Sequence, residues 1–326
     1  MNEKYTEVLS QYELEVLNVK RGRGAWLCET DRGLKLLREY KGTIKRLEFE
    51  DQVFAQLEEN GPLKLDRYVR NKDGELLSGA EDGTRWIVKD WYEDRECNLK
   101  DSREVLCAIG KIAFLHRKLR QVEFKEEWNL GSILVQMPAE EMERHNRELI
   151  RARTFIRNKR KKSEFELGIM ENYDTFFEQA LKACQGMTEF CRDRGNKGGY
   201  LCHGDLNQHH ILMCGHDVAM VEFNRMHKGM QMEDLYHFMR KAMEKHDWNL
   251  KLGKAMLETY SKILPLSEED RACLYYLFLY PEKYWKQINF YYNANKAWIP
   301  VRNIEKLKEL EIQQPMRNLF LSQIKG

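Results

Sequence analysis

One stretch, residues 203–213, constrains this chain more than any other and reads HGDLNQHHILM. Short apolar runs lie on both sides of its acidic residue, Asp205, and are typical of strands. A second apolar run leads into another acidic residue in the tripeptide Val221-Glu222-Phe223. The pattern predicts two strand ends that each present a carboxylate to the same cleft.

Two carboxylates at neighbouring strand ends are how phosphoryl-transfer folds present a base and a metal ligand to one phosphate. Asp205 is the candidate catalytic base, because a carboxylate in this place can accept the proton of an attacking hydroxyl. The triplet His203-Gly204-Asp205 alone would be weak support. Its place between two strands, with Asp234 and Leu235 opening a helix further on, makes the interpretation specific.

The chain has 326 residues, which exceeds the usual limit for one core and favours two lobes. Residues 12–40 read as three short strands, residues 45–57 as a helix, and runs near 63–71 and 85–91 as further strands of a small antiparallel sheet. From there the pattern turns helical. The sequence therefore predicts an α+β fold: an N-terminal β lobe over residues 1–95 and a larger, mostly helical lobe over residues 96–326.

Composition narrows the class of protein. Charges nearly balance at +2, so the whole chain shows no bias toward nucleic acid or a membrane surface. No window approaches the roughly 18 apolar residues of a membrane span, and the N-terminus lacks the apolar core of a signal peptide. Eight cysteines form no C-x-x-C pair, which favours free thiols over disulfides or a zinc site. A cytoplasmic chain is expected.

A strand cation paired with a helix carboxylate, ahead of an acidic loop, suggests that nucleotide phosphates are held between the lobes. Glu50 falls within the apolar face of the helix at 45–57 and needs a cation; Arg38 on the third strand is the candidate. The alternative is that Arg38 is a solvated edge charge and Glu50 is merely tolerated. Gly22 and Gly24 could lay backbone N–H groups over phosphates, although a plain β-turn is equally consistent.

Two further groups of residues are candidate sites. The histidines at 203, 209, 210 and 216 could be read as a metal cluster, but adjacent residues on an extended loop point apart, which favours packing or loop roles. The basic run over residues 151–162 is usually a solvated helix face; the alternatives are a docking surface for an acidic partner or, with no supporting motif, RNA binding.

The residues around Asp205 and Glu222 resemble the aminoglycoside phosphotransferase and choline kinase superfamily, whose pattern is H-G-D-x-x-x-x-N followed by I-D-F. More narrowly, segments 234–241 (DLYHFMRK), 280–286 (YPEKYWK) and 291–298 (YYNANKAW) resemble the CotS-type spore-coat proteins. The resemblance covers nearly the whole chain. It implies a bilobal protein-kinase-like fold, ATP as the nucleotide, and a catalytic-loop-like segment at 200–223.

The resemblance assigns roles that the residues only partly fit. It puts Arg38 where the family has a phosphate-binding Lys, with Glu50 as helix partner; His210 where it has a metal-binding Asn; and Glu222 where it has a metal-binding Asp. Arginine is bulkier than an ammonium, and glutamate moves an oxygen by about 1.5 Å. Imidazole suits Mg²⁺ poorly, though Mn²⁺ accepts it more readily.

Losing metal stabilisation of about 4 kcal/mol would slow phosphoryl transfer on the order of a thousandfold. The sequence thus predicts a degenerate phosphotransferase, a pseudokinase, that acts as scaffold or interaction protein among spore-coat proteins on the mother-cell side. The retained Asp205 supports the alternative, an active ATP-dependent enzyme acting on a small metabolite or a coat protein. Neither membrane nor nucleic-acid partners are expected.

Overall fold

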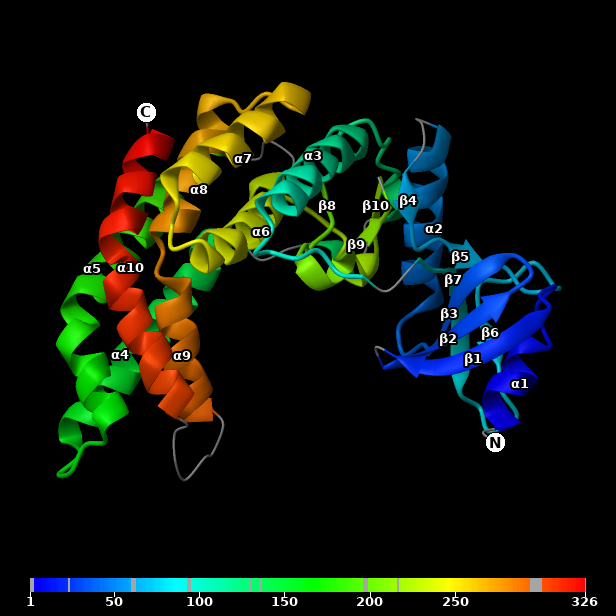
Figure 1. Ribbon diagram of the computed structural model, residues 1–326, viewed down its shortest axis with the longest axis horizontal. Coiled ribbons are helices and arrows are strands. Elements are labelled where there is room, and N and C mark those ends of the chain that lie inside the picture. Colours follow the sequence, from blue (N-terminus) through cyan, green and yellow to red (C-terminus); the bar gives the residue numbers. More distant parts are fainter. Residues whose placement is uncertain are drawn as a thin grey trace. The chain divides into compact units, whose positions relative to one another are not determined.

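The computed structural model describes residues 3–22, 24–59, 63–92, 95–128, 131–134, 137–195, 199–215, 217–293 and 301–325. The chain divides into two compact units, Met1–Leu134 with Tyr200–Asp234, and Val135–Gly199 with Leu235–Gly326. The predicted lobe boundary after residue 95 falls inside the first unit and stays a prediction. The second unit is helical, whereas the first unit holds the strands (Figure 1).

The first unit begins with α1 (Glu3–Leu9) and is built on an antiparallel six-stranded sheet. Its path is β1 (Val16–Gly22), β2 (Ala25–Thr30), β3 (Gly33–Glu39), β7 (Arg85–Asp90) and β5 (Tyr68–Val69), with β6 (Ser78–Gly79) also paired to β7. All of these strands except β6, which was not predicted, overlap the runs predicted between residues 12 and 91. Tyr12, predicted within the first strand, instead lies outside it and packs in the core beside α1.

Three short strands form a second sheet beneath the loop that carries Asp205. β4 (Lys64–Leu65) pairs in parallel with β10 (Asp217–Met220), which pairs antiparallel with β9 (Ile211–Cys214). The extended run near 63–71 is therefore split between two sheets, because only β5 joins the antiparallel sheet. β8 (Tyr200–Cys202) and β11 (His227–Gly229) make a separate pair. Asp205 and Glu222 thus lie at the ends of β8 and β10.

Helices α2 (Ile44–Glu59) and α3 (Ser102–Leu119) complete the first unit. Asp101 caps α3 by accepting from the Arg103 N–H. Asp101 and Glu104 have the spacing of a capping box, but no such box forms, because the Glu104 carboxylate accepts from the Asn98 N–H and from Arg95. Arg95 and Asn98, in the loop before α3, therefore occupy the Glu104 carboxylate that a capping box would need.

The second unit is an assembly of helices in which α4 packs on α5 and α9, and α10 packs on α5, α7, α8 and α9. Their bounds are α4 (Pro138–Asn158), α5 (Glu164–Arg194), α6 (Gln231–Lys245), α7 (Leu250–Ile263), α8 (Glu268–Leu279), α9 (Glu282–Asn293) and α10 (Val301–Lys325). Helix α6 begins in the first unit. Among the helices of the described residues, none has the length and apolar character that crossing a bilayer requires.

The predicted α+β class is confirmed: an antiparallel sheet precedes a mostly helical remainder. All eight cysteines carry free thiols, and five of them are buried, as the absence of paired spacings indicated.

Candidate functional site

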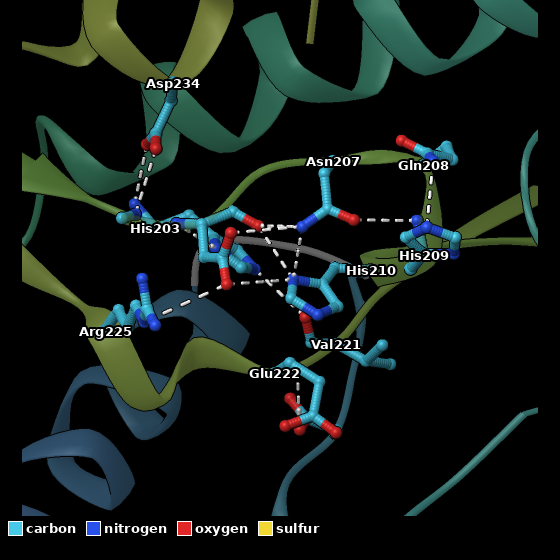
Figure 2. Close-up of polar contacts among 12 residues, drawn as sticks. His203, Asn207, Gln208, His209, His210, Val221, Glu222, Arg225 and Asp234 are labelled. Carbon is cyan, nitrogen blue, oxygen red and sulfur yellow. Dashed lines mark hydrogen bonds and ion pairs between the residues drawn. The ribbon is translucent and has the colours of Figure 1, made fainter. Parts of the chain in front are cut away.

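The backbone after β8 is held in place by one buried carboxylate. Asp234, near the start of α6, accepts hydrogen bonds from the N–H groups of His203 at 2.7 Å and Gly204 at 2.9 Å. Figure 2 shows this carboxylate turned toward the loop. Burial opposes its charge, yet the hydrogen bond with His116, the nearby imidazoles and the Gly204 N–H lower the pKa of Asp234 to about 2. The loop is thus fixed by a permanent anion.

Position 204 requires glycine for two reasons. Its φ is +86°, a left-handed conformation that side chains disfavour. A Cβ there would also lie 2.1 Å from the carbonyl oxygen of Arg225, which is backbone and cannot rotate away. The glycine therefore lets the Asp205 loop and the segment after Glu222 approach one another.

His203 ties the two strand ends together. Its side chain is fully buried; Nε2 lies 3.0 Å from the Val221 carbonyl oxygen, and Nδ1 accepts from the Asp205 N–H at 3.2 Å. Burial lowers the pKa of His203 to about 4, so the ring is neutral, with its proton on Nε2. It packs under the loop, as the sequence indicated, and supports Asp205 without reaching solvent.

The Asp205 side chain is 36% exposed, as a base that meets a substrate would have to be. Asn207 donates through Nδ2 to both the backbone oxygen and Oδ1 of Asp205, at 3.0 and 3.1 Å. The Asn207 oxygen accepts from the His209 N–H and so caps the short turn at 208–210. Sequence reasoning missed Asn207, although an Asn just before a turn is a common capping signal.

His210 holds the loop through one of its ring nitrogens. Its Nδ1 lies 2.7 Å from the Asp205 backbone oxygen, which means that Nδ1 carries the proton and donates. The same atom is 3.9 Å from Oδ2 of Asp205. Figure 2 shows the ring between Asn207 and Glu222. One of its two nitrogens is therefore committed to fixing the loop.

Arg38 and Glu222 form a bidentate ion pair. From β3, Nη1 and Nη2 of Arg38 donate to Oε2 and Oε1 of Glu222, each at 2.6 Å. Burial opposes both charges, yet the paired hydrogen bonds raise the pKa of Arg38 and lower the pKa of Glu222. Glu222 also has φ +70°, an uncommon backbone conformation for a non-glycine residue. Both carboxylate oxygens of Glu222 thus accept from one guanidinium.

A second buried pair lies behind this contact. Asp66, with no exposed surface, accepts from Lys89 Nζ and from the Glu222 N–H, both at 2.9 Å and both on Oδ2. Burial raises the pKa of Asp66 although Lys89 opposes that shift. The backbone of Glu222 is therefore positioned by a residue near β4. Neither Asp66 nor Lys89 was singled out from the sequence.

Glu50 has a different partner from the one expected. Its carboxylate accepts from Nε of Arg46 at 2.6 Å and from the Tyr68 hydroxyl at 2.5 Å. Arg46 stands one helical turn before Glu50, so the i,i+4 spacing supplies the cation locally. Arg46 also donates to the Asn224 carbonyl, which links α2 to the segment just after Glu222.

The glycine loop forms a tight hairpin between β1 and β2. Gly22 is paired with Ala25, and Gly24 has φ +69°. Arg23, between the two glycines, lies outside the described residues. A two-residue hairpin of this kind is what a plain β-turn requires, so a phosphate-binding role for Gly22 and Gly24 stays a prediction.

The donor set does not fit a divalent metal as arranged. Mg²⁺ needs free carboxylate oxygens, but both oxygens of Glu222 accept from Arg38. Nδ1 of His210 is bound to the loop, which leaves Nε2 as its one possible ligand atom, and imidazole suits Mg²⁺ poorly. Over the part of the chain that the structure describes, no group of three or more His, Cys, Asp or Glu residues is arranged to hold an ion. His209 contacts Glu96 at 2.5 Å, and His216 lies outside the described residues.

Apolar side chains fill the space where the two sheets meet. Leu36 from β3 packs with Trp91 and with Leu212 from β9, and all three are at most 4% exposed. Ala25, Leu27, Ala219 and Val221 belong to the same cluster. The strands that bring Arg38 and Glu222 together are therefore joined by a packed core.

Comparison with known proteins gives one relative and many structures of the same fold, while no family model matches the chain. Spore coat protein S of Bacillus subtilis (strain 168) is 20% identical, over 98% of this chain and 93% of that protein. An aminoglycoside phosphotransferase from Alicyclobacillus acidocaldarius superposes with a TM-score of 0.84 at 16% identity, covering 98% of this chain and 95% of that one.

A spectinomycin phosphotransferase bound to AMP superposes with a TM-score of 0.67 at 10% identity, covering 94% of this chain and 96% of that one. At such identities the structures establish the fold alone. The resemblance seen in the sequence is confirmed at that level, and the chain has the protein-kinase-like fold of the aminoglycoside phosphotransferases together with end-to-end sequence similarity to a spore coat protein.

Proposed function

We propose that this chain is a kinase-like protein of the spore coat whose phosphotransferase site no longer turns over, and that it acts as a scaffold or interaction protein. Similarity to spore coat protein S along nearly the whole chain supports the coat assignment. The phosphotransferase fold supports descent from an enzyme. We expect the chain to be made in the mother-cell cytoplasm and to assemble into the coat with other coat proteins.

The Arg38–Glu222 contact carries this proposal. The resemblance assigns Arg38 to phosphate binding and Glu222 to metal binding, yet each side chain is the other's partner through two hydrogen bonds of 2.6 Å. Bidentate pairs of this kind are strong and geometrically specific. A nucleotide and its metal would have to separate the pair before either residue could take its ancestral role.

The residue at the position of the metal-binding Asn also supports the proposal. His210 donates Nδ1 to the Asp205 carbonyl oxygen, which leaves only Nε2 to bind an ion, and imidazole suits Mg²⁺ poorly.

A second candidate function is an active ATP-dependent phosphotransferase acting on a small metabolite or a coat protein. Asp205 favours this function, because its side chain is 36% exposed and is oriented by hydrogen bonds from Asn207. The loop beneath it is still fixed by Asp234 and a neutral His203. In that case the spectinomycin enzyme, which binds AMP, would be a guide to the nucleotide.

Thermal unfolding with ATP alone, with ATP and Mg²⁺, and with ATP and Mn²⁺ separates the two functions. A ligand at one hundred times its Kd adds about 2.7 kcal/mol to the free energy of unfolding. We expect no rise in Tm under any of the three conditions. A metal-dependent rise would favour the active enzyme, and a metal-independent rise would indicate a nucleotide-binding protein without turnover.

Phosphoryl transfer to coat proteins provides the direct test, with Asp205→Ala as the active-site variant and Asp73→Ala, an exposed turn carboxylate, as control. We expect wild type and both variants to be equally inactive. Phosphorylation that is present in wild type and in Asp73→Ala but lost in Asp205→Ala would refute the proposal.

A further inference from the structure

The turn that joins α4 to α5 concentrates positive charge. Residues 157–166 read RNKRKKSEFE, with five cations ahead of two acids. We call residues 157–162 the α4–α5 tip; it lies at one end of the helix pair (Figure 1). Basic runs are most often solvated helix faces. The contacts of each side chain distinguish that ordinary role from a binding surface.

Some cations of this region are structural. Lys159 donates to Oε1 of Glu166 at 2.6 Å, inside the capping box that Glu166 makes with Ser163. Lys162 donates to the Lys159 carbonyl oxygen at 3.0 Å. Arg153, one turn before the tip, pairs with Asp174 at 3.0 Å. These cations hold the turn and the start of α5 together.

The other three cations of the tip make no such structural contacts. Arg157, Arg160 and Lys161 are exposed, and within the described residues their side chains make no hydrogen bond or ion pair. Arg157, in the last turn of α4, gains from the helix dipole, but Arg160 and Lys161 lie beyond the helix end and gain little. Three like charges within five positions repel one another. Fold stability does not explain them.

The neighbouring acids are already paired, so they cannot neutralise the tip. Glu166 is fully buried and accepts from Lys159 and from the Tyr291 hydroxyl. Glu164 pairs with Lys308 of α10 at 3.2 Å. Close to the tip, Phe155 keeps 55% of its surface exposed and contacts Tyr292 edge-on. The surface therefore offers free cations beside an exposed aromatic ring.

We propose that the α4–α5 tip is a docking surface for an acidic polypeptide, whose carboxylates pair with Arg157, Arg160 and Lys161 and whose apolar side chains contact Phe155. A protein fits better than nucleic acid, because only three cations of the tip are free and the net charge of the whole chain is only +2. This inference rests on the proposed interaction role and names the surface and partner chemistry for it.

The test measures fluorescence anisotropy of labelled poly-L-glutamate titrated with the full chain. The triple variant R157E/R160E/K161E should bind at least about tenfold more weakly, since each exposed ion pair contributes modestly and three are reversed. The variant R157A/R160A/K161A should lie between it and wild type. Binding should weaken as salt shortens the screening length.

The control is K100E/K251E/K262E, which reverses three exposed lysines elsewhere and changes the net charge equally. It should bind as wild type does, and circular dichroism should show every variant folded. Equal weakening in both triple variants, or tighter binding of oligouridylate or of phosphatidylglycerol vesicles than of poly-L-glutamate, would overturn the proposal.

The variant Asp205→Ala separates this inference from the proposed function. It should bind poly-L-glutamate like wild type, because Asp205 takes no part in the surface. If phosphoryl transfer is found while tip binding persists, only the proposed loss of turnover fails. If no transfer is found and the tip variants bind normally, only the docking surface fails.

Discussion

Separating Arg38 from Glu222 should lower the free energy of unfolding by about 2–3 kcal/mol. Arg38→Met removes the guanidinium while keeping a chain of similar length, and Glu222→Gln removes the negative charge while keeping the shape. The double variant removes both charges. Together with wild type these proteins form a double-mutant cycle, which isolates the energy of the pair from the other contacts of each side chain.

The expected loss of stability follows from the burial and the hydrogen-bond geometry of the Arg38–Glu222 pair. The side chains of Arg38 and Glu222 are 27% and 11% exposed, so solvent screens the pair only in part. Breaking a buried pair costs about 3–5 kcal/mol, whereas an exposed pair contributes at most about 1 kcal/mol. Two charge-assisted hydrogen bonds at 2.6 Å place this pair between those limits. Lys89 keeps some compensating charge near Glu222 when Arg38 is removed.

Urea unfolding followed by tryptophan fluorescence at pH 7 and low salt measures the cycle. We expect a coupling energy of about 2 kcal/mol, with the double variant more stable than Arg38→Met alone because no charge is left buried and unpaired. A coupling energy below about 0.5 kcal/mol would refute the reasoning that Arg38 and Glu222 form a strong, partly buried ion pair.

The same pair predicts a pH dependence. The folded pKa of Glu222 is lowered from 4.5, so its contribution to stability is complete above that pH and is lost as pH falls through the folded value. The cost of Arg38→Met should therefore be largest at neutral pH and should shrink below pH 4.5. A cost that stays constant down to pH 3 would contradict an ionic origin.

Two other buried carboxylates give further predictions. Asp234→Asn leaves one oxygen to accept from the N–H groups of His203 and Gly204, which should lower the free energy of unfolding by about 2–3 kcal/mol at neutral pH. Urea unfolding measures this difference. Because the folded pKa of Asp234 is about 2, the greater stability of wild type should shrink only as pH falls from 3.8 toward 2. Lys89→Met should lower the free energy of unfolding by about 3–5 kcal/mol, because it leaves Asp66 buried without its cation. Adding Asp66→Asn should restore part of that stability. A loss below about 1 kcal/mol in Lys89→Met would show that Asp66 is already neutral.

Local sequence was sufficient for the elements and for most loop features. Alternating apolar residues and glycines predicted the strands that became β1, β2 and β3, and helical spacing predicted α2 at 45–57, close to its bounds of 44–59. The positions of Asp205 and Glu222 at strand ends followed in the same way. These features depend on neighbours within a few residues, whose steric and hydrogen-bonding preferences the sequence displays directly.

The partner of Glu50 was available in the sequence but was overlooked. Arg46 stands four residues before it, a spacing that places both side chains on one helix face. The resemblance instead implies a cation on a strand, Arg38. A helix by itself brings residues four positions apart together, so this pair needs no tertiary structure to form.

What the sequence by itself determined is an α+β chain with the outline of a phosphotransferase and three altered positions. Only the tertiary structure decided that two of these, Arg38 and Glu222, 184 residues apart, are each other's partner, and that Asp66 and Lys89 lie behind them. Local sequence biases backbone conformation, but the choice among distant charges depends on which strands pack together and how deeply each group is buried. The folded arrangement therefore supplies the main support for the proposal that this site has become structural.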